Sequence, residues 1–322
     1  MKLSVRKATA LLGVALLGLA ACGSDNSGGS SATTAAGAST SAAGGGDTIS
    51  ASLTVGSGNF PESVLLAEIY AGALEAKGAK VTRKLNIGNR EAYYNAITGG
   101  ELDLLPEYTN SLLSFILKAK NESPTAKNVD EQITALKAAL PENLTVLEPS
   151  AAEDKDVIVC NKETTDKYGF KTLSDLSAKA GEITLGGPPE FATRSPFGVP
   201  GFKEFYNATF KSFVPLEIGP PIVDALKSNA INCGNLFSTM SSITTNNFTA
   251  LDDDKTIVPN EAVLPLISKA KAGEGGVTDT LDAISAKLDT PGLVAMMVEI
   301  EVDKKAELDV AKEWLGKNGF TK

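Results

Sequence analysis

Short β-type runs alternate with stretches of helical periodicity along the body of the chain. In the first part we expect a helix from Pro61 to Gly78, because proline suits the first helical turn and glycine commonly ends a helix. The other expected elements are strands at 53–55, 80–85 and 102–105, helices at 90–97 and 109–118, and a turn at 106–108. This β-α-β-α-β-α order is typical of a mostly parallel sheet with helices on both faces.

A second series of the same kind begins near Asp154. Strands are expected at 156–160, 183–186, 213–216 and 231–236, with a helix at 222–228. Roughly the last 60 residues have a helical pattern, with an amphipathic stretch at 277–288, an interruption at Pro291 and a final helix capped by Asp303. We therefore predict an α/β protein with two lobes and a cleft between them, in which the second lobe is inserted into the first.

The first 22 residues have the pattern of a bacterial lipoprotein signal. A basic start precedes an apolar stretch of about 14 residues, which is shorter than the roughly 20 needed to span a bilayer. The segment Leu19-Ala20-Ala21-Cys22 then resembles a lipobox, whose cysteine is acylated and becomes the new N-terminus. We predict a signal peptide at 1–21 and lipid attachment at Cys22, with ordinary secretion and an incidental cysteine as the alternative.

The segment after Cys22 has too little apolar surface to form a core. Residues 23–50 are almost entirely glycine, serine, alanine and threonine. A random coil of this length reaches roughly 30 Å. We predict that residues 22–50 are a flexible tether, which holds a lipid-anchored body at the extracytoplasmic face of the cell membrane and near its membrane partner.

Charge narrows the possible partners. The chain has 30 Lys and Arg against 39 Asp and Glu, and loss of the predicted signal with its three basic residues leaves a formal net charge of −12. Such an acidic body has no general attraction for nucleic acid, so we predict no nucleic-acid partner. No other apolar stretch reaches the roughly 18 residues of a membrane span, so the body from Leu53 onward is expected to fold outside the bilayer.

The chain contains no histidine. This excludes Ser-His and Cys-His nucleophiles, histidine metal ligation and histidine acid–base catalysis. The run Asp252-Asp253-Asp254 can be interpreted as glycosidase carboxylates, but consecutive acidic residues are more typical of a solvated turn. We predict no enzymatic activity, no cofactor and no metal site. Cys160 and Cys233 are expected to form a disulfide in an oxidising compartment, with two buried free thiols as the alternative.

Four segments carry a family resemblance: VGSGNFPES at 55–63, GGELDLLPEYTNS at 99–111, GGPPEFATR at 186–194 and LFST at 236–239. In this order they resemble the substrate-binding proteins of osmoprotectant ABC transporters, which bind glycine betaine, carnitine or choline. The resemblance implies a type II periplasmic-binding-protein fold that closes on its ligand by a hinge. It places lobe I at 51–154 plus 260–322 and lobe II at 155–259. The implied partners are a permease and its ATPase. We predict that the protein itself is a monomer.

The resemblance also implies a ligand site. A trimethylammonium group is held by aromatic faces, and Tyr108 and Phe237 match two positions of the family's aromatic cage. Arg194 matches the arginine that grips a ligand carboxylate, and Ser111 can add its hydroxyl and backbone N–H at a helix start. Asn59, in the first loop, is a further candidate. The alternatives are core packing of the two rings and an ion pair between Arg194 and Glu190.

Some positions depart from the family pattern. Asp156 and the pair Asn260-Glu261 stand where relatives commonly have tyrosines, and Gly58 stands where many have a lysine. We count Asp156, Asn260 and Glu261 among the ligand-site candidates, and they favour a ligand that donates hydrogen bonds or has net positive charge. The alternative is that Asp156 and Glu261 face solvent and that Tyr93, Tyr94 or Phe60 supplies the missing rings.

These features favour a receptor that captures a quaternary-ammonium or related osmolyte and delivers it to an ABC permease. Two other functions stay open: the same fold binding a different small polar or cationic solute, and a structural envelope lipoprotein without a role in transport.

Overall fold

The computed structural model describes residues 48–322. The predicted signal peptide, lipid attachment at Cys22 and tether up to residue 47 lie outside the described residues. The folded body already includes Ile49, at the end of the predicted tether, because this side chain is 1% exposed and its backbone N–H donates to the carbonyl of Lys77. In the range 48–322, no helix is long and apolar enough to cross a bilayer.

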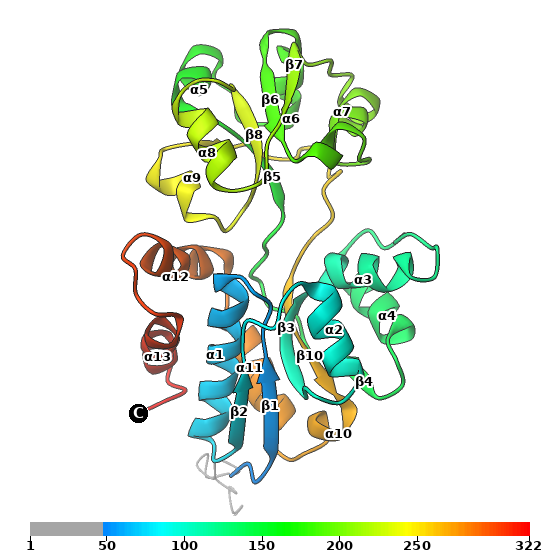
Figure 1. Ribbon diagram of the computed structural model, residues 1–322, viewed down its shortest axis with the longest axis vertical. Helices are drawn as coiled ribbons and strands as arrows, with labels where there is room; N and C mark the ends of the chain where they lie inside the picture. The colour runs from blue at the N-terminus through cyan, green and yellow to red at the C-terminus, as the bar shows by residue number, and fades with distance from the viewer. Residues whose placement is uncertain (1–47) are drawn as a thin grey trace, which may run out of the picture. The chain divides into compact units, whose positions relative to one another are not determined.

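Five strands form the first sheet: β1 (Ser52–Gly56), β2 (Lys80–Lys84), β3 (Leu104–Tyr108), β4 (Leu144–Val146) and β10 (Val263–Ser268). They lie in the order β2-β1-β3-β10-β4 (Figure 1). β1 is parallel to β2 and β3, whereas β10 is antiparallel to β3 and β4. The sheet is thus parallel on one side and antiparallel on the other.

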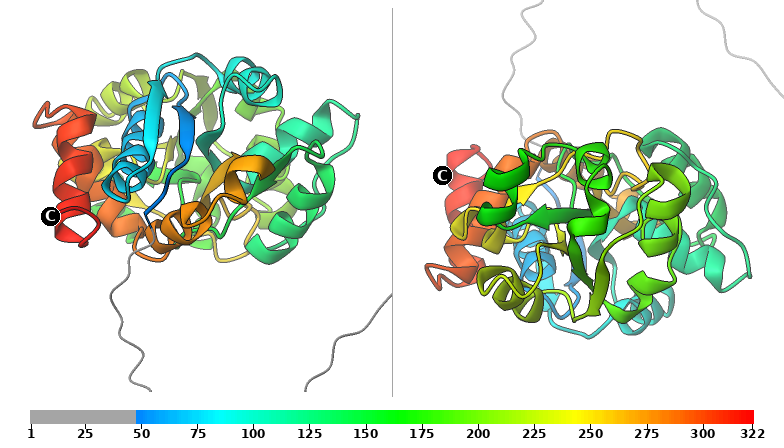
Figure 2. Two further views of the ribbon diagram at one scale, coloured as in Figure 1. Left: turned by 90° about the horizontal axis from the view of Figure 1, so that it is seen from below. Right: turned by 90° about the horizontal axis from the view of Figure 1, so that it is seen from above.

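Helices cover both faces of this sheet. They are α1 (Pro61–Ala76), α2 (Arg90–Thr98), α3 (Thr109–Lys118), α4 (Val129–Ala139), α10 (Lys269–Ala272), α11 (Val277–Ser285), α12 (Thr290–Glu301) and α13 (Glu307–Lys317). α1 and α13 lie on one side of the sheet and α3 and α4 on the other (Figures 1 and 2). Each face therefore has its own apolar core.

The alternation of side chains along each strand explains the two cores. Leu104 belongs to the cluster with α1, α11 and α13, whereas the next residue, Leu105, belongs to the cluster with α2, α3 and α4. On β10, Val263 belongs to the first of these clusters and Leu264 to the second. Successive strand residues point to opposite faces, so a strand buried on both faces has a continuous apolar sequence.

Five further strands form the second sheet, in the order β7-β6-β8-β5-β9. They are β5 (Asp156–Cys160), β6 (Thr184–Gly187), β7 (Ser212–Pro215), β8 (Cys233–Phe237) and β9 (Thr249–Ala250). The helices around them are α5 (Lys162–Tyr168), α6 (Leu173–Ser177), η1 (Ala180–Glu182), η2 (Pro189–Ala192), α7 (Val199–Tyr206), α8 (Pro220–Lys227) and α9 (Ser241–Thr245). Ile158 and Val159 pack into different clusters, so this sheet is also buried on both faces.

A disulfide links two neighbouring strands of the second sheet. Cys160 at the end of β5 stands opposite Cys233 at the start of β8 in the antiparallel ladder, and their sulfur atoms are bonded. Both side chains are fully buried.

Two chain segments connect the sheets, 147–155 and 251–262, and they are joined to each other by hydrogen bonds. The N–H of Asp154 donates to the carbonyl of Glu261 at 3.1 Å, and Nδ2 of Asn260 donates to Oε1 of Glu153 at 2.7 Å. The strands of the first sheet fall within predicted lobe I and those of the second within predicted lobe II. The lobe boundaries themselves stay predictions.

Three local predictions were wrong. Residues 106–108 were predicted as a turn, but they complete β3, where Pro106 stands opposite Pro265 and the two residues without an N–H face each other. The C-terminal segment was predicted to be helical, but it begins with β10, whose apolar run Val263–Ser268 has strand length. Asp303 was predicted as a helix cap, but α13 begins at Glu307, with Ala306 in the cap position.

Candidate functional site

A pocket of about 490 Å³ lies at the C-terminal end of β3, between groups from both sheets and from α12. Its lining is aromatic, acidic and sulfur-containing in character: Phe60, Pro61, Glu62, Arg90, Tyr108, Ser111, Asp154, Ile218, Phe237, Thr239, Met240, Met297 and Glu301. Ligands of open α/β sheets bind at the carboxyl ends of strands, so the position agrees with a binding site. Tyr108, Ser111 and Phe237 of the predicted ligand set line it.

Tyr108 is held by the start of α1. Its hydroxyl donates to Oε1 of Glu62 at 2.5 Å, and its ring centroid lies 6.4 Å from that of Phe60. Both Tyr108 and Glu62 are buried, with 6% and 4% of their surface exposed. Burial, together with the nearby Glu62 carboxylate, raises the pKa of Tyr108, so its hydroxyl stays a hydrogen-bond donor.

Three carboxyl groups line the pocket, and each accepts from a different hydroxyl. Glu62 accepts from Tyr108, Asp154 accepts from Oγ1 of Thr239 at 2.8 Å, and Glu301 accepts from Oγ of Ser241 at 2.5 Å. Thr239 and Ser241 follow β8, whereas Glu301 ends α12, so these bonds connect the second sheet to elements outside it. The pocket wall is therefore acidic, and each of these carboxyl groups is held by a hydrogen bond.

Burial changes the ionisation of two of these groups. Burial and then the charge of Asp154 raise the pKa of Glu62 to about 8. Burial also raises the pKa of Asp154 to about 6, although hydrogen bonds from Thr239 act in the opposite direction. Carboxyl groups with such raised values ionise more readily when a positive charge lies beside them.

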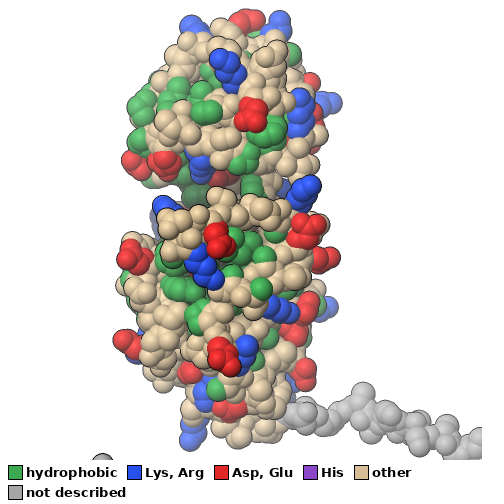
Figure 3. All heavy atoms as spheres, turned by 90° about the vertical axis from the view of Figure 1, so that its right-hand side faces the viewer, with side chains coloured by type: hydrophobic (Ala, Val, Ile, Leu, Met, Phe, Trp, Pro, Cys, Tyr) green, Lys and Arg blue, Asp and Glu red, His purple; other side chains and the backbone are tan. Residues whose placement is uncertain are grey.

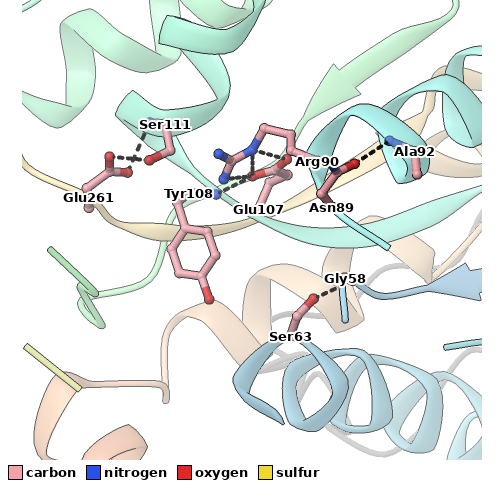
Figure 4. A network of polar contacts seen from close by, with 9 residues as sticks. All are labelled: Gly58, Ser63, Asn89, Arg90, Ala92, Glu107, Tyr108, Ser111 and Glu261. Carbon is pink, nitrogen blue, oxygen red and sulfur yellow. Dashed lines mark hydrogen bonds and ion pairs between the residues drawn. The ribbon is translucent and has the colours of Figure 1, made fainter. Parts of the chain in front are cut away.

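Arg90 also lines the pocket, but a buried partner neutralises its charge. Its Nε lies 3.0 Å from Oε1 of Glu107 and its Nη2 lies 3.1 Å from Oε2, so the pair is bidentate (Figure 4). Glu107 is fully buried and also accepts from the backbone N–H of Tyr108. The pair of Arg90 and Glu107 thus fixes the end of β3 beside the pocket. The Tyr108 ring points away from this pair in Figure 4.

A second, larger pocket of about 940 Å³ contains the other predicted residues Arg194, Asp156 and Glu261, and it shares Arg90 and Ser111 with the first. Arg194 does not form the alternative ion pair with Glu190. Its Nη2 lies 3.2 Å from Oδ2 of Asp156, and only its backbone N–H contacts the carbonyl of Glu190. Its Nε donates to the carbonyl of Phe197 at 2.7 Å. The predicted carboxylate-gripping arginine is therefore held by two groups of the chain, although its buried Nη2 atom has no hydrogen-bond partner in residues 48–322.

Glu261 occupies the helix start that was predicted to face a ligand. It accepts from the backbone N–H of Ser111 at 3.1 Å and from the Ser111 hydroxyl at 2.7 Å (Figure 4). This side chain is only 8% exposed, so the alternative that it faces solvent is wrong, and its burial raises its pKa to about 7.

The remaining candidates lie apart from the smaller pocket. The side chain of Asn260 is bonded to Glu153, and Asn59 is exposed, with its backbone N–H donating to the carbonyl of Gly88. Of the three rings considered as substitutes, Phe60 lines the pocket, Tyr93 is buried among α2 and α3, and Tyr94 packs edge-on against Phe115 at 5.2 Å.

The sequence analysis did not predict the three acidic residues that line the smaller pocket, Glu62, Asp154 and Glu301. Glu62 lies inside one of the four family-like segments, next to Pro61, and its place in the first turn of a helix was a usable signal. Asp154 and Glu301 lie in a connecting segment and at a helix end, and no pattern marked them. Among residues 48–322, no group of acidic or cysteine side chains has an arrangement that would hold a metal ion.

Comparison with known proteins gives one consistent result. Residues 51–317 match the family model described as the substrate-binding domain of the ABC-type glycine betaine transport system. The glycine betaine-binding protein YehZ of Escherichia coli K12 is 26% identical over 287 residues, which cover 85% of this chain and 92% of that protein. The carnitine transport binding protein OpuCC of Listeria monocytogenes is 25% identical and covers 84% of this chain and 87% of its own length.

Solved structures agree with the fold. The structure of apo YehZ from Escherichia coli superposes with a TM-score of 0.71 at 25% identity, covering 84% of this chain and 99% of that one. A glycine betaine/carnitine/choline ABC transporter structure gives a TM-score of 0.75 at 22% identity, covering 83% and 99%. The two-sheet α/β architecture is thus that of periplasmic binding proteins, as predicted. The chain belongs to the family of substrate-binding domains of ABC-type glycine betaine transport systems.

Proposed function

We propose that the protein is the extracytoplasmic receptor of an ABC importer, which captures an osmolyte with an onium group in the 490 Å³ pocket and delivers it to the permease. The observation that carries this proposal is the joint presence of three aromatic residues, Phe60, Tyr108 and Phe237, and three carboxyl groups in one pocket of a family member.

The chemistry of the pocket fits a methylated ammonium group. Such a group has a delocalised positive charge and donates no N–H hydrogen bond, so aromatic faces and negatively polarised oxygen atoms are its best neighbours. Phe237 is unusual for a large apolar side chain because 39% of its surface is exposed. The exposed part of the Phe237 ring on the pocket wall is therefore available to a ligand.

The arrangement of the chain fits capture by a hinge. The pocket is lined by residues of β3 in the first sheet, of α1 beside that sheet and of β8 in the second sheet. The two connecting segments join the sheets. A ligand held by both sides stabilises the arrangement in which both sides contact it. We further propose that the mature protein is a monomer without enzymatic activity, anchored by lipid at Cys22.

A thermal-shift screen of the purified protein tests the proposal. Glycine betaine, choline and carnitine are compared with glucose and glutamate as solutes without an onium group. At least one onium solute is expected to raise the melting temperature in a concentration-dependent manner, because a ligand that binds only the folded state stabilises it by mass action. If no onium solute shifts the melting temperature, the proposal is wrong.

Two phenylalanines of the second sheet region provide a matched pair of variants. Phe237 and Phe205 are 39% and 41% exposed, but only Phe237 is among the residues that line the pocket. Phe237→Ala is expected to weaken binding of the best onium ligand roughly 3- to 30-fold, the range of a cation–π contact. Phe205→Ala is expected to leave the affinity unchanged. Equal effects of the two substitutions would remove Phe237 from the site.

A further inference from the structure

The carboxyl groups of the pocket lack counter-charges within the chain. In the described part of the protein, no lysine or arginine forms an ion pair with Glu62, Asp154 or Glu301. The one cationic residue that lines the pocket, Arg90, is paired with the buried Glu107. The pocket thus combines three acidic groups with one internally neutralised pair.

One of these carboxyl groups also has a free hydrogen-bonding atom. Oε1 of Glu62 accepts from Tyr108, but the buried Oε2 atom of the same group has no hydrogen-bond partner in residues 48–322. The side chain is only 4% exposed and lines the pocket. A buried polar atom without a partner costs free energy, so a ligand donor beside Oε2 would be favoured.

The same surroundings are unfavourable for a ligand carboxylate. Arg194, the residue predicted to grip one, lines the larger pocket and is ion-paired with Asp156 at 3.2 Å. Ser111, the other predicted partner, already donates both its N–H and its hydroxyl to Glu261. An anionic group placed beside Asp154 would meet a like charge, because the pKa of Asp154, about 6, leaves this group largely ionised at neutral pH.

We propose that the ligand is a compact cation without a carboxylate, whose onium group lies among Phe60, Tyr108 and Phe237 and whose hydrogen-bond donor reaches Oε2 of Glu62. This inference rests on the proposed receptor function and narrows its ligand class to choline-like solutes, as opposed to zwitterionic betaines. Asp154 and Glu301 contribute negative potential around the same cation.

Three probes of similar size separate the parts of this proposal. Choline has an onium group and an O–H donor, tetramethylammonium has only the onium group, and glycine betaine has a carboxylate in place of the donor. In calorimetric titrations of the purified protein, choline is expected to bind at least tenfold more tightly than either of the others. Glycine betaine or carnitine binding as tightly as choline would overturn the inference and leave the receptor function intact.

Isosteric variants test which carboxyl group causes the preference for choline. Glu62→Gln keeps an acceptor for Tyr108 and removes the charge, so it is expected to weaken choline binding at least tenfold and to weaken glycine betaine binding much less. Glu301→Gln, at the end of α12, provides a second test if the first variant folds poorly. Glu142→Gln makes the same chemical change at an exposed position in the loop before β4 and is expected to change neither affinity.

The outcomes of these titrations distinguish the receptor function from the ligand class. A choline preference that survives both pocket variants would overturn the assignment to Glu62 and Glu301. Binding of none of the onium probes by wild-type protein would overturn the receptor function and the ligand class together. A choline preference that is lost in the pocket variants and kept in Glu142→Gln supports both.

Discussion

At the scale of single residues, the pair of Tyr108 and Glu62 dominates the candidate site. The Tyr108 ring lines the pocket, although only 6% of its surface is exposed and it also packs in the apolar cluster with α1. Its hydroxyl donates to one oxygen of Glu62, and the other oxygen has no hydrogen-bond partner in residues 48–322. The two functions of the tyrosine can be separated, because one needs the ring and the other needs only the hydroxyl.

Two substitutions at Tyr108 make this separation. Tyr108→Phe keeps the ring and is expected to reduce affinity for the best onium ligand by less than about tenfold, the scale of one hydrogen bond. Tyr108→Ala removes ring and hydroxyl and is expected to reduce affinity by a larger factor than the phenylalanine variant. Calorimetry on both variants measures the difference. Equal losses would show that the ring contributes nothing to binding.

The raised pKa of Glu62 predicts a pH-dependent affinity. Burial and Asp154 place this pKa at about 8, so the free pocket holds a proton on Glu62 at neutral pH, and the groups around it are Tyr108, Thr239, Asp154 and Glu301. A bound cation lowers the pKa and displaces that proton. Affinity for choline is expected to rise from pH 6 to pH 8 and then level off, with proton release during titration. An affinity that is flat or falls over this range contradicts the assignment.

The same group predicts a pH-dependent stability of the free protein. The pKa of Glu62 is about 8 in the folded state against an ordinary value of 4.5, so between these values the folded state keeps a proton that the unfolded state loses. Stability from this group therefore falls as pH rises from about 4.5 to about 8. Glu62→Gln is expected to be more stable than wild type at pH 8, by roughly 1 to 3 kcal/mol, and by less at pH 5. Thermal melts of both proteins at the two pH values measure this, and a constant difference would contradict it.

Residue-level prediction from sequence had a clear limit. Tyr108 and Phe237 were recognisable because they lie in segments typical of the family, and both line the pocket. Asp154 and Glu301 were not recognisable, because a carboxylate in a loop or at a helix end is usually solvated. Asp154 and Glu301 can be recognised as site residues only in the folded structure, where they line the same pocket as Glu62.

At the scale of secondary-structure elements, the most predictable elements were those whose local pattern agrees with their final pairing. β5 (Asp156–Cys160) and α3 (Thr109–Lys118) were predicted with the bounds that the structure shows. The errors fell where local pattern and long-range pairing disagree. Residues 106–108 contain a proline that is typical of turns, but pairing with β10, more than 150 residues later, extends the strand.

The disulfide between β5 and β8 gives an element-scale prediction. It joins residues separated by 73 positions, and such a link mainly restricts the unfolded chain. The double variant Cys160→Ala/Cys233→Ala is expected to lose about 2 to 4 kcal/mol of unfolding free energy in urea melts, while ligand affinity below the melting temperature changes little. The pocket does not include either cysteine, so a large loss of affinity would contradict this separation of stability from binding.

At the scale of the whole molecule, charge is distributed without a dominant patch on the face shown in Figure 3. Lysine and arginine side chains lie scattered among aspartate and glutamate over that face. In the pocket, by contrast, three carboxyl groups, those of Glu62, Asp154 and Glu301, line one cavity.

The molecule-scale organisation was predictable because it follows from the order of elements. Two α/β series, with the second placed between parts of the first, predicted two sheets joined by two connections. The antiparallel β10, which returns the chain to the first sheet, was not predicted. Its short apolar run resembles a buried helix segment until the pairing with β3 and β4 is known.

The central claim is that this family member binds an onium cation in the pocket between Phe60, Tyr108 and Phe237. Calorimetric titration of the wild-type protein with choline at pH 8 tests it most directly. We predict saturable binding at a single site, with glycine betaine binding at least tenfold more weakly. If neither choline nor any other onium solute gives measurable heat of binding at concentrations up to the millimolar range, the claim is contradicted.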